Sequence, residues 1–265
     1  SLSRMSHPYV VIAPSYMVYS IDFDQFIHTH IDSGADVTLL YHSVDNAKEA
    51  YLTCNVLNLN RQKGVEAIGP NHGNKKNQNI YMDTCVMKTE LFISLVREAK
   101  KLSSMYTLAD ILNDKCETLD IRGVAHKGFF ASITDFPSYY AANMDLLDKN
   151  NALDLNDPAW KIYTEDVTAL PQYIGADAVV DRAFITQGCV VNGKVKNSVL
   201  FTGAKVAEGA QVIDSVLMPG AEVAEGAVVT RTLVADGVKI GKNAVVGSAD
   251  SKNIELVAKR VKGDE

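Results

Sequence analysis

The side chains suited to acid–base or metal chemistry are unevenly distributed along this chain. All six histidines precede residue 174, and the four cysteines are widely separated with no C-x-x-C pair, which argues against a zinc or redox centre. Three aspartates, Asp22, Asp110 and Asp135, are candidate metal ligands, because hard divalent cations prefer carboxylate oxygens. The alternative, which we favour, is that each caps a helix or is a solvated carboxylate.

The composition is that of an ordinary globular protein. The chain has 265 residues, 47% of them hydrophobic and 22% charged, with a net charge of −6 and a pI near 5.5. An acidic chain without a block of Lys and Arg is not expected to bind nucleic acid. No run approaches the ~18 apolar residues of a membrane span, and no signal peptide opens the chain. Scattered single cysteines are typical of a reducing compartment, so we expect a cytoplasmic protein.

The elements that position these side chains fall into two parts, and residues 1–148 are expected to form an α/β domain. Residues 9–13 (YVVIA) are typical of a buried strand. Asp22 is a suitable N-cap for a helix that ends at Gly34, and residues 37–41 (VTLLY) predict the next strand. Strand, helix and strand within about thirty residues make a βαβ unit, which predicts a parallel sheet.

The boundary between the two parts is expected after a helix that begins at Asp135, with Pro137 in its first turn. We expect this helix to close the α/β domain. Residues 149–173 then form a linker, in which Trp160 is expected to wedge between domains, and residues 174–265 form a second domain.

A 17-residue repeat dominates this second domain. The segment VAEGA begins at Val206 and again 17 residues later at Val223, and the related IGKNA begins at Ile240. Valines at 195, 212, 229 and 246 repeat at the same spacing in a second register. An aliphatic residue at about every sixth position, with small residues at the corners, predicts a left-handed parallel β-helix of hexapeptide repeats. Stacked coils bury their apolar faces, so we interpret the segment as a module for packing and assembly.

The sequence argues against acyltransferase activity in these coils. Hexapeptide-repeat proteins are often acyltransferases, which need a histidine near the coils as a general base. Residues 174–265 contain no histidine. Acyltransferase activity is therefore not expected unless a neighbouring chain supplies the base.

Four motifs in order along the chain resemble those of ADP-glucose pyrophosphorylases. Residues 128–147 (GFFASITDFPSYYAANMDLL) are similar to GYWxDVGTxxSYYxANMxLL of that family, and residues 157–164 (DPAWKIYT) to its DPxWPIYT. Residues 188–193 (GCVVNG) are similar to its GCxIxG, and residues 197–200 (NSVL) match its NSVL. The resemblance extends from about residue 9 to residue 247. It implies a nucleotidyltransferase domain of the Rossmann-like α/β class followed by a left-handed β-helix.

The resemblance also implies an activity, the synthesis of ADP-glucose and pyrophosphate from ATP and glucose 1-phosphate for glycogen or starch synthesis. In the family, Mg²⁺ held by two aspartates neutralises the charge that develops when the sugar phosphate attacks the α-phosphorus. The cofactors of the family are therefore Mg²⁺ and ATP.

This chain departs from the family at the positions that carry the chemistry. The first metal aspartate lies in SGDHxYxxDY, where this chain has Ser15 and Tyr16 in place of the Gly-Asp pair, and the second is replaced by Ser132. The lysine of the EKP motif corresponds to Gly69, and the SMGIY segment for glucose corresponds to residues 81–85 (YMDTC). The glycine-rich phosphate loop is absent, and we expect the native protein to have further residues before Ser1.

This pattern resembles the GlgD-type subunit, a catalytically deficient partner of an active GlgC-type subunit. The leading hypothesis is therefore a regulatory subunit of glucose-1-phosphate adenylyltransferase that assembles through its β-helix as a hetero-oligomer or a homo-oligomer. It is expected to have no cofactor or metal of its own and no intact catalytic residue. A sugar-phosphate effector is a candidate ligand. His126 beside Lys127 is a candidate anion site, although an exposed polar pair is the default interpretation. The alternatives are an active sugar-phosphate nucleotidyltransferase with relocated metal ligands and a purely structural assembly protein.

Overall fold

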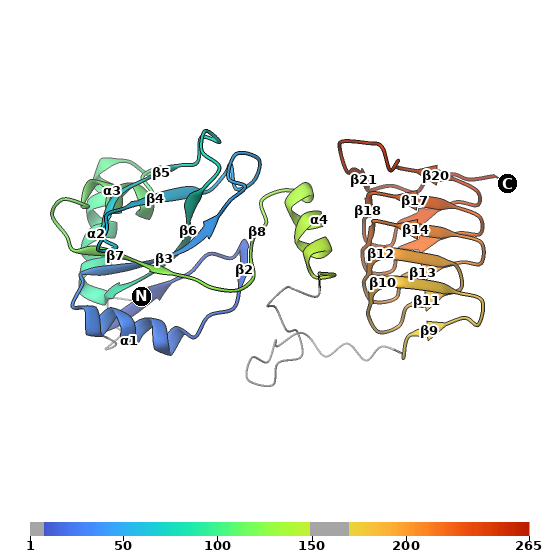
Figure 1. Cartoon of the computed structure of the whole chain (residues 1–265), viewed down its shortest axis with the longest axis horizontal. Coiled ribbons are helices and arrows are strands. Elements are labelled where there is room, and N and C mark those ends of the chain that lie inside the picture. Colours follow the sequence, from blue (N-terminus) through green and yellow to red (C-terminus); the bar gives the residue numbers. More distant parts are fainter. Residues whose placement is uncertain (1–7, 149–169, 265) are drawn as a thin grey trace. The chain divides into compact units, whose positions relative to one another are not determined.

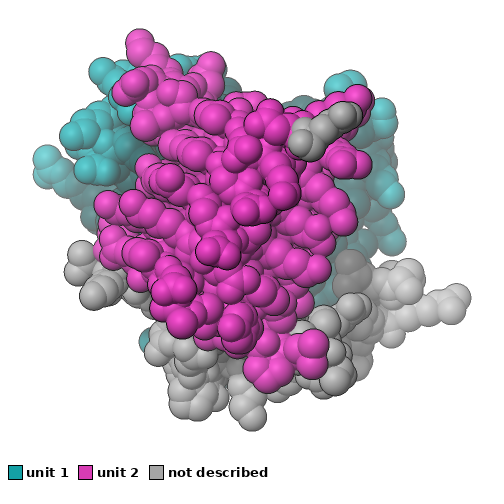
Figure 2. Space-filling model, turned by 90° about the vertical axis from the view of Figure 1, so that its right-hand side faces the viewer, with its two compact units in different colours: residues 1–132 teal, residues 133–265 magenta. Residues whose placement is uncertain are grey.

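A computed structural model describes residues 8–148 and 170–264. The chain divides into two compact units, Ser1–Ser132 and Ile133–Glu265, which are described separately (Figure 2). Most of the predicted linker, including Trp160, lies outside the described residues. Within the described part of the chain, no helix is long and apolar enough to cross a membrane.

The first unit is built on a mixed sheet rather than the predicted parallel one (Figure 1). Its strands are β1 (Tyr9–Ile12), β3 (Val37–Val44), β4 (Asn55–Leu59), β5 (Val65–Pro70), β6 (Gln78–Lys88) and β7 (Ile121–Ala125), in the order β5-β4-β6-β3-β7 with β1 on β6. β1 and β3 run in the same direction, as a βαβ unit requires. The long strand β6 lies between them and is antiparallel to both, whereas β3 and β7 are parallel.

Helices cover both faces of this sheet (Figure 1). α1 (Phe23–Ser33) begins after Asp22 and ends at Gly34, whose φ of 68° is accessible to glycine at little cost. Its Phe26 packs with Leu40 on one face. α2 (Thr89–Leu102) and α3 (Leu108–Asp114) pack with Leu39 on the other face, because neighbouring residues of a strand point to opposite sides.

The first unit also contains a small two-stranded sheet. It pairs β2 (Met17–Tyr19) with β8 (Phe130–Ser132) in antiparallel fashion. Met17 and Phe130 belong to the same buried cluster as Leu40, so this small sheet is anchored in the core of the first unit.

The second unit contains the predicted parallel β-helix. Its strands are β9 (Tyr173–Ile174), β10 (Val179–Ile185), β11 (Val190–Val191), β12 (Lys194–Leu200), β13 (Lys205–Val206), β14 (Gln211–Ile213), β15 (Val216–Leu217), β16 (Glu222–Val223), β17 (Val228–Thr230), β18 (Thr232–Val234), β19 (Lys239–Ile240), β20 (Val245–Val246) and β21 (Glu255–Val257). The strands stack in parallel (Figure 1). The 17-residue spacing is confirmed, because Val206 pairs with Val223, and Val223 with Ile240. These side chains fill the interior of the coils.

α4 (Phe136–Asp145) corrects the expectation that the helix after Asp135 closes the α/β domain. It groups with the β-helix unit, where Tyr140 packs against Val199, Val216 and Leu233. These three residues form a stacked column that faces out of the coils rather than into their interior. The apolar column needs a cover, and α4 provides it.

Candidate active site

The two positions that carry metal aspartates in the resembled family are brought together by β2 and β8. Ser15 and Tyr16 directly precede β2, and Ser132 ends β8. Met17, the residue after Tyr16, is the antiparallel partner of Ser132. The two positions that the resemblance aligns with metal aspartates therefore lie close together in this fold, and both carry neutral hydroxyl groups.

Asp83 joins this site, although it was not among the candidate site residues predicted from the sequence. The Tyr16 phenol donates a hydrogen bond to the Asp83 carboxylate. Asp83 lies where the pairing of β6 with β3 is interrupted, and its φ of 45° is in the left-handed region that favours glycine. In the SMGIY segment a glycine stands at this position, so an aspartate in YMDTC was the available signal. Aspartate tolerates this conformation better than most residues.

The remaining groups near Tyr16 and Asp83 are neutral. The Tyr19 hydroxyl lies 2.6 Å from the Thr84 hydroxyl, and the Cys54 thiol donates to the Ser132 hydroxyl at 3.4 Å. Burial raises the pKa of the Cys54 thiol, so the thiol form is favoured.

The electrostatics of the site also oppose negative charge. Burial raises the pKa of Asp83 above its ordinary value, although the Tyr16 hydrogen bond acts in the opposite direction. Burial and the nearby Asp83 carboxylate raise the pKa of Tyr16, so the phenol keeps its proton. Asp83 is thus a single carboxylate that is already engaged by a phenol.

These residues do not fit a Mg²⁺ ion of the kind the family uses. Such an ion is held by carboxylates together with phosphate oxygens and water in octahedral geometry. Tyr16 and Ser132 supply no carboxylate, and the described residues contain no group of three or more His, Cys, Asp or Glu side chains placed to hold a metal. No catalytic step is therefore assigned to a metal at this site.

Gly69, the position of the family lysine, lies on β5 opposite Val56 of β4. A Cβ atom built there would meet nothing within 4 Å, so the glycine is not required by a close contact at that atom. Asn71, two residues further on, donates its backbone N–H to the carbonyl of Cys54 at 2.9 Å. The end of β5 therefore reaches the Cys54 region without a cationic side chain at position 69.

The three aspartates considered as relocated ligands are helix caps. Asp22 accepts from the Gln25 N–H at 2.9 Å, and Asp135 accepts from the Ser138 N–H at 2.8 Å. Asp110 completes a capping box by accepting from the Thr107 N–H at 2.8 Å. Asp22 and Asp135 are N-caps, and Asp110 is the third residue of α3, so each takes part in capping a different helix, which is the interpretation favoured from the sequence.

His126 is not an exposed partner of Lys127. It is buried, its Nε2 lies 2.8 Å from the Ser20 carbonyl oxygen, and its Nδ1 lies 3.1 Å from Nδ1 of His42. Burial lowers the pKa of both histidines, which favours their neutral forms. The default interpretation of an exposed polar pair is therefore wrong for His126, and both of its ring nitrogens already have partners, which leaves neither for the candidate anion.

Comparisons with known proteins agree with this fold. Residues 171–261 match the family model described as GlmU-like, C-terminal hexapeptide, which identifies the coils as a left-handed β-helix. The chain is 30% identical over 211 residues to a glucose-1-phosphate adenylyltransferase of Halalkalibacterium halodurans, covering 77% of this chain and 54% of that protein. It is 30% identical over 209 residues to the glycogen biosynthesis protein GlgD of Geobacillus stearothermophilus, covering 79% of this chain and 50% of that protein.

The chain spans about half the length of the curated relatives it matches. The similarity covers both units, and the sequence motifs occur in the order of the family. The chain therefore belongs to the glucose-1-phosphate adenylyltransferase family, which includes GlgD-type proteins.

Proposed function

We propose that this chain is part of a regulatory, catalytically deficient subunit of glucose-1-phosphate adenylyltransferase that acts in glycogen biosynthesis. The observation that supports the proposal is the pairing of β2 with β8, which brings Tyr16 close to Ser132, the two positions that the resemblance aligns with the metal aspartates of the family. A phenol and an alcohol are poor Mg²⁺ ligands. The loss of both carboxylates removes most of the negative charge that would hold the ion.

The proposed partner is an active GlgC-type subunit. The first coil of the β-helix supports assembly, because its apolar side chains are exposed: Tyr173 by 58%, Ile174 by 41% and Val179 by 54%. Terminal coils of solenoids need a polar surface or a cover to remain soluble. An exposed apolar surface of this kind is typical of a protein–protein interface, which a regulatory subunit needs in order to bind its partner.

The test is ADP-glucose synthesis by the full-length protein, alone and mixed with an active subunit. We expect little activity from the protein alone, and a changed turnover or effector response of the active subunit in the mixture. Substantial activity alone that is lost on changing Asp83 or Ser132 would overturn the proposal and favour relocated ligands.

A second test restores the two carboxylates by substitution and measures metal binding. Tyr16→Asp combined with Ser132→Asp should give tighter Mn²⁺ binding than the parent, measured by electron paramagnetic resonance. Asp83→Asn added to this double variant separates the contribution of the resident carboxylate from that of the two introduced ones.

A further inference from the structure

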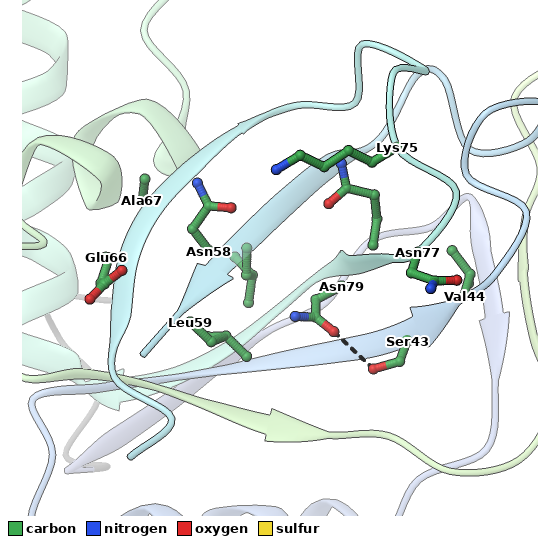
Figure 3. A pocket seen from close by; sticks show the side chains of 11 residues that line it. Ser43, Val44, Asn58, Leu59, Glu66, Ala67, Lys75, Asn77 and Asn79 are labelled. Atoms are coloured by element: carbon green, nitrogen blue, oxygen red, sulfur yellow. Dashed lines mark hydrogen bonds between the residues drawn. The ribbon is translucent and has the colours of Figure 1, made fainter. Parts of the chain in front are cut away.

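A cleft of about 760 Å³ opens on the first unit (Figure 3). It is formed by β3, β4, β5 and the start of β6, together with the loop that carries Lys75 and Asn77. Leu57, which contributes to its wall, belongs to the core cluster on the α2 and α3 side of the sheet. Val44, which also lines the cleft, packs against the opposite cluster, so the cleft lies between strands and is not confined to one face. None of its lining residues takes part in the contacts of the candidate active site.

Carboxamide groups dominate the polar lining of this cleft. Asn58, Asn77, Gln78 and Asn79 all contribute to it. The Ser43 hydroxyl donates to Oδ1 of Asn79 at 2.9 Å, which leaves the Asn79 amide N–H groups free to donate outward (Figure 3). A carboxamide both donates and accepts hydrogen bonds, and so does an alcohol. Such a lining therefore complements a ligand that is rich in hydroxyl groups.

The charge of the cleft argues against a phosphorylated or nucleotide ligand. One cation, Lys75, and one anion, Glu66, line it, so their charges offset each other. Among the described lining residues there is no arginine for a phosphate and no aromatic ring for a base. Leu59 and Val44, which are partly exposed, supply apolar surface beside the amides, which suits the C–H faces of a pyranose ring.

We propose that this cleft binds an α-glucan chain, the polymer made in glycogen biosynthesis. The choice of glucose polymer rests on the proposed function, whereas the preference for a neutral polyhydroxylated ligand rests on the cleft itself. The cleft would hold the subunit on the growing polymer while its partner supplies the activated sugar.

The experiment is titration of the full-length protein with maltoheptaose, followed by calorimetry and by affinity electrophoresis in glycogen-containing gels. Free glucose and cellohexaose are run in parallel, to separate binding of a single pyranose from binding of an α-linked chain. We expect saturable binding of maltoheptaose at millimolar or lower concentration and at least tenfold weaker binding of glucose. Absence of maltoheptaose binding, or equal binding of cellohexaose, would overturn the proposal.

Variants locate the site. Asn58→Ala combined with Asn77→Ala should weaken maltoheptaose binding at least tenfold, and both side chains are exposed, so the fold should tolerate their loss. Gln62→Ala, at the exposed turn between β4 and β5 and outside the cleft, is the matched control and should bind normally. Unchanged binding by the double variant would contradict this placement. None of these measurements uses ATP or a partner subunit, so the outcome is independent of the test of catalytic deficiency.

Discussion

The phenol of Tyr16 donates a hydrogen bond to the carboxylate of Asp83, 67 residues further along the chain. It links the segment before β2 to the interrupted part of β6. In the resembled family these two places carry a metal aspartate and a glycine of the glucose segment. By that resemblance, this chain has a phenol at the first place and a carboxylate at the second, and the two are hydrogen-bonded to each other.

Tyr16→Phe is expected to lower the free energy of unfolding of the first unit by about 1 kcal/mol. It removes one hydrogen bond to a partly buried carboxylate, and such bonds typically contribute on the order of 1 kcal/mol net. Urea denaturation of the parent and the variant measures the change. A double-mutant cycle with Asp83→Ala is the control, because the two effects should be non-additive if the residues interact.

Asp83→Asn is expected to remove a pH dependence of stability. Burial raises the pKa of Asp83 in the folded protein, so the folded state binds this proton more tightly than the unfolded chain does. The parent should therefore lose stability as the pH rises through that raised pKa, and regain it on acidification. Asparagine does not ionise and tolerates the φ of 45° at this position.

The measurement is chemical denaturation of the parent and of Asp83→Asn between mildly acidic and neutral pH. The variant should be the more stable at neutral pH, and the difference should shrink as the pH falls. A difference that stays constant with pH would show that Asp83 does not carry this linkage.

The β-helix could be predicted from sequence alone because its contacts repeat at a fixed interval. Val212 pairs with Val229, so the 17-residue spacing of the sequence equals the register between neighbouring coils. The position of β6 between β1 and β3 could not be predicted, because strand order depends on pairings between distant segments. Asp83 was missed for a similar reason, since its partner Tyr16 becomes a neighbour only after β2 and β8 have formed. The capping roles of Asp22 and Asp135 were predictable because they are local.

Tyr140 provides a test of which unit α4 stabilises. Its ring is 8% exposed and covers the Val199–Val216–Leu233 column, and its hydroxyl donates to the Asp214 carbonyl. Tyr140→Ala should destabilise the β-helix unit by about 3–5 kcal/mol, as truncation of a buried aromatic side chain usually does. Tyr140→Phe keeps the ring and should cost only about 1 kcal/mol.

Phe136 on the same helix is the matched control for these variants. It is 38% exposed, so Phe136→Ala should cost under about 1 kcal/mol. Thermal denaturation followed by circular dichroism compares the three variants. Equal losses for Tyr140→Ala and Phe136→Ala would contradict the assignment of α4 as the cover of the column.

Arg231 is the residue at which the β-helix is expected to gain stability by substitution. It occupies a corner position with a φ of 49°, one coil beyond Asp214 at 47° and two coils beyond Asn197 at 46°. A left-handed conformation costs an ordinary residue on the order of 1 kcal/mol, whereas asparagine tolerates it. The Arg231 Nε atom is also buried, with no hydrogen-bond partner among the described residues.

Arg231→Asn is therefore expected to raise the free energy of unfolding by about 1 kcal/mol, because it relieves the backbone cost and removes an unsatisfied donor. The Asn197 amide already donates to the Asp214 carboxylate at 2.7 Å, so an asparagine one coil further along has a ready partner in the same carboxylate. Asn197→Arg is the reciprocal control and should lower stability by a similar amount. If Arg231→Asn instead destabilises the protein in calorimetric scans, the guanidinium has a partner in solution that offsets the strain.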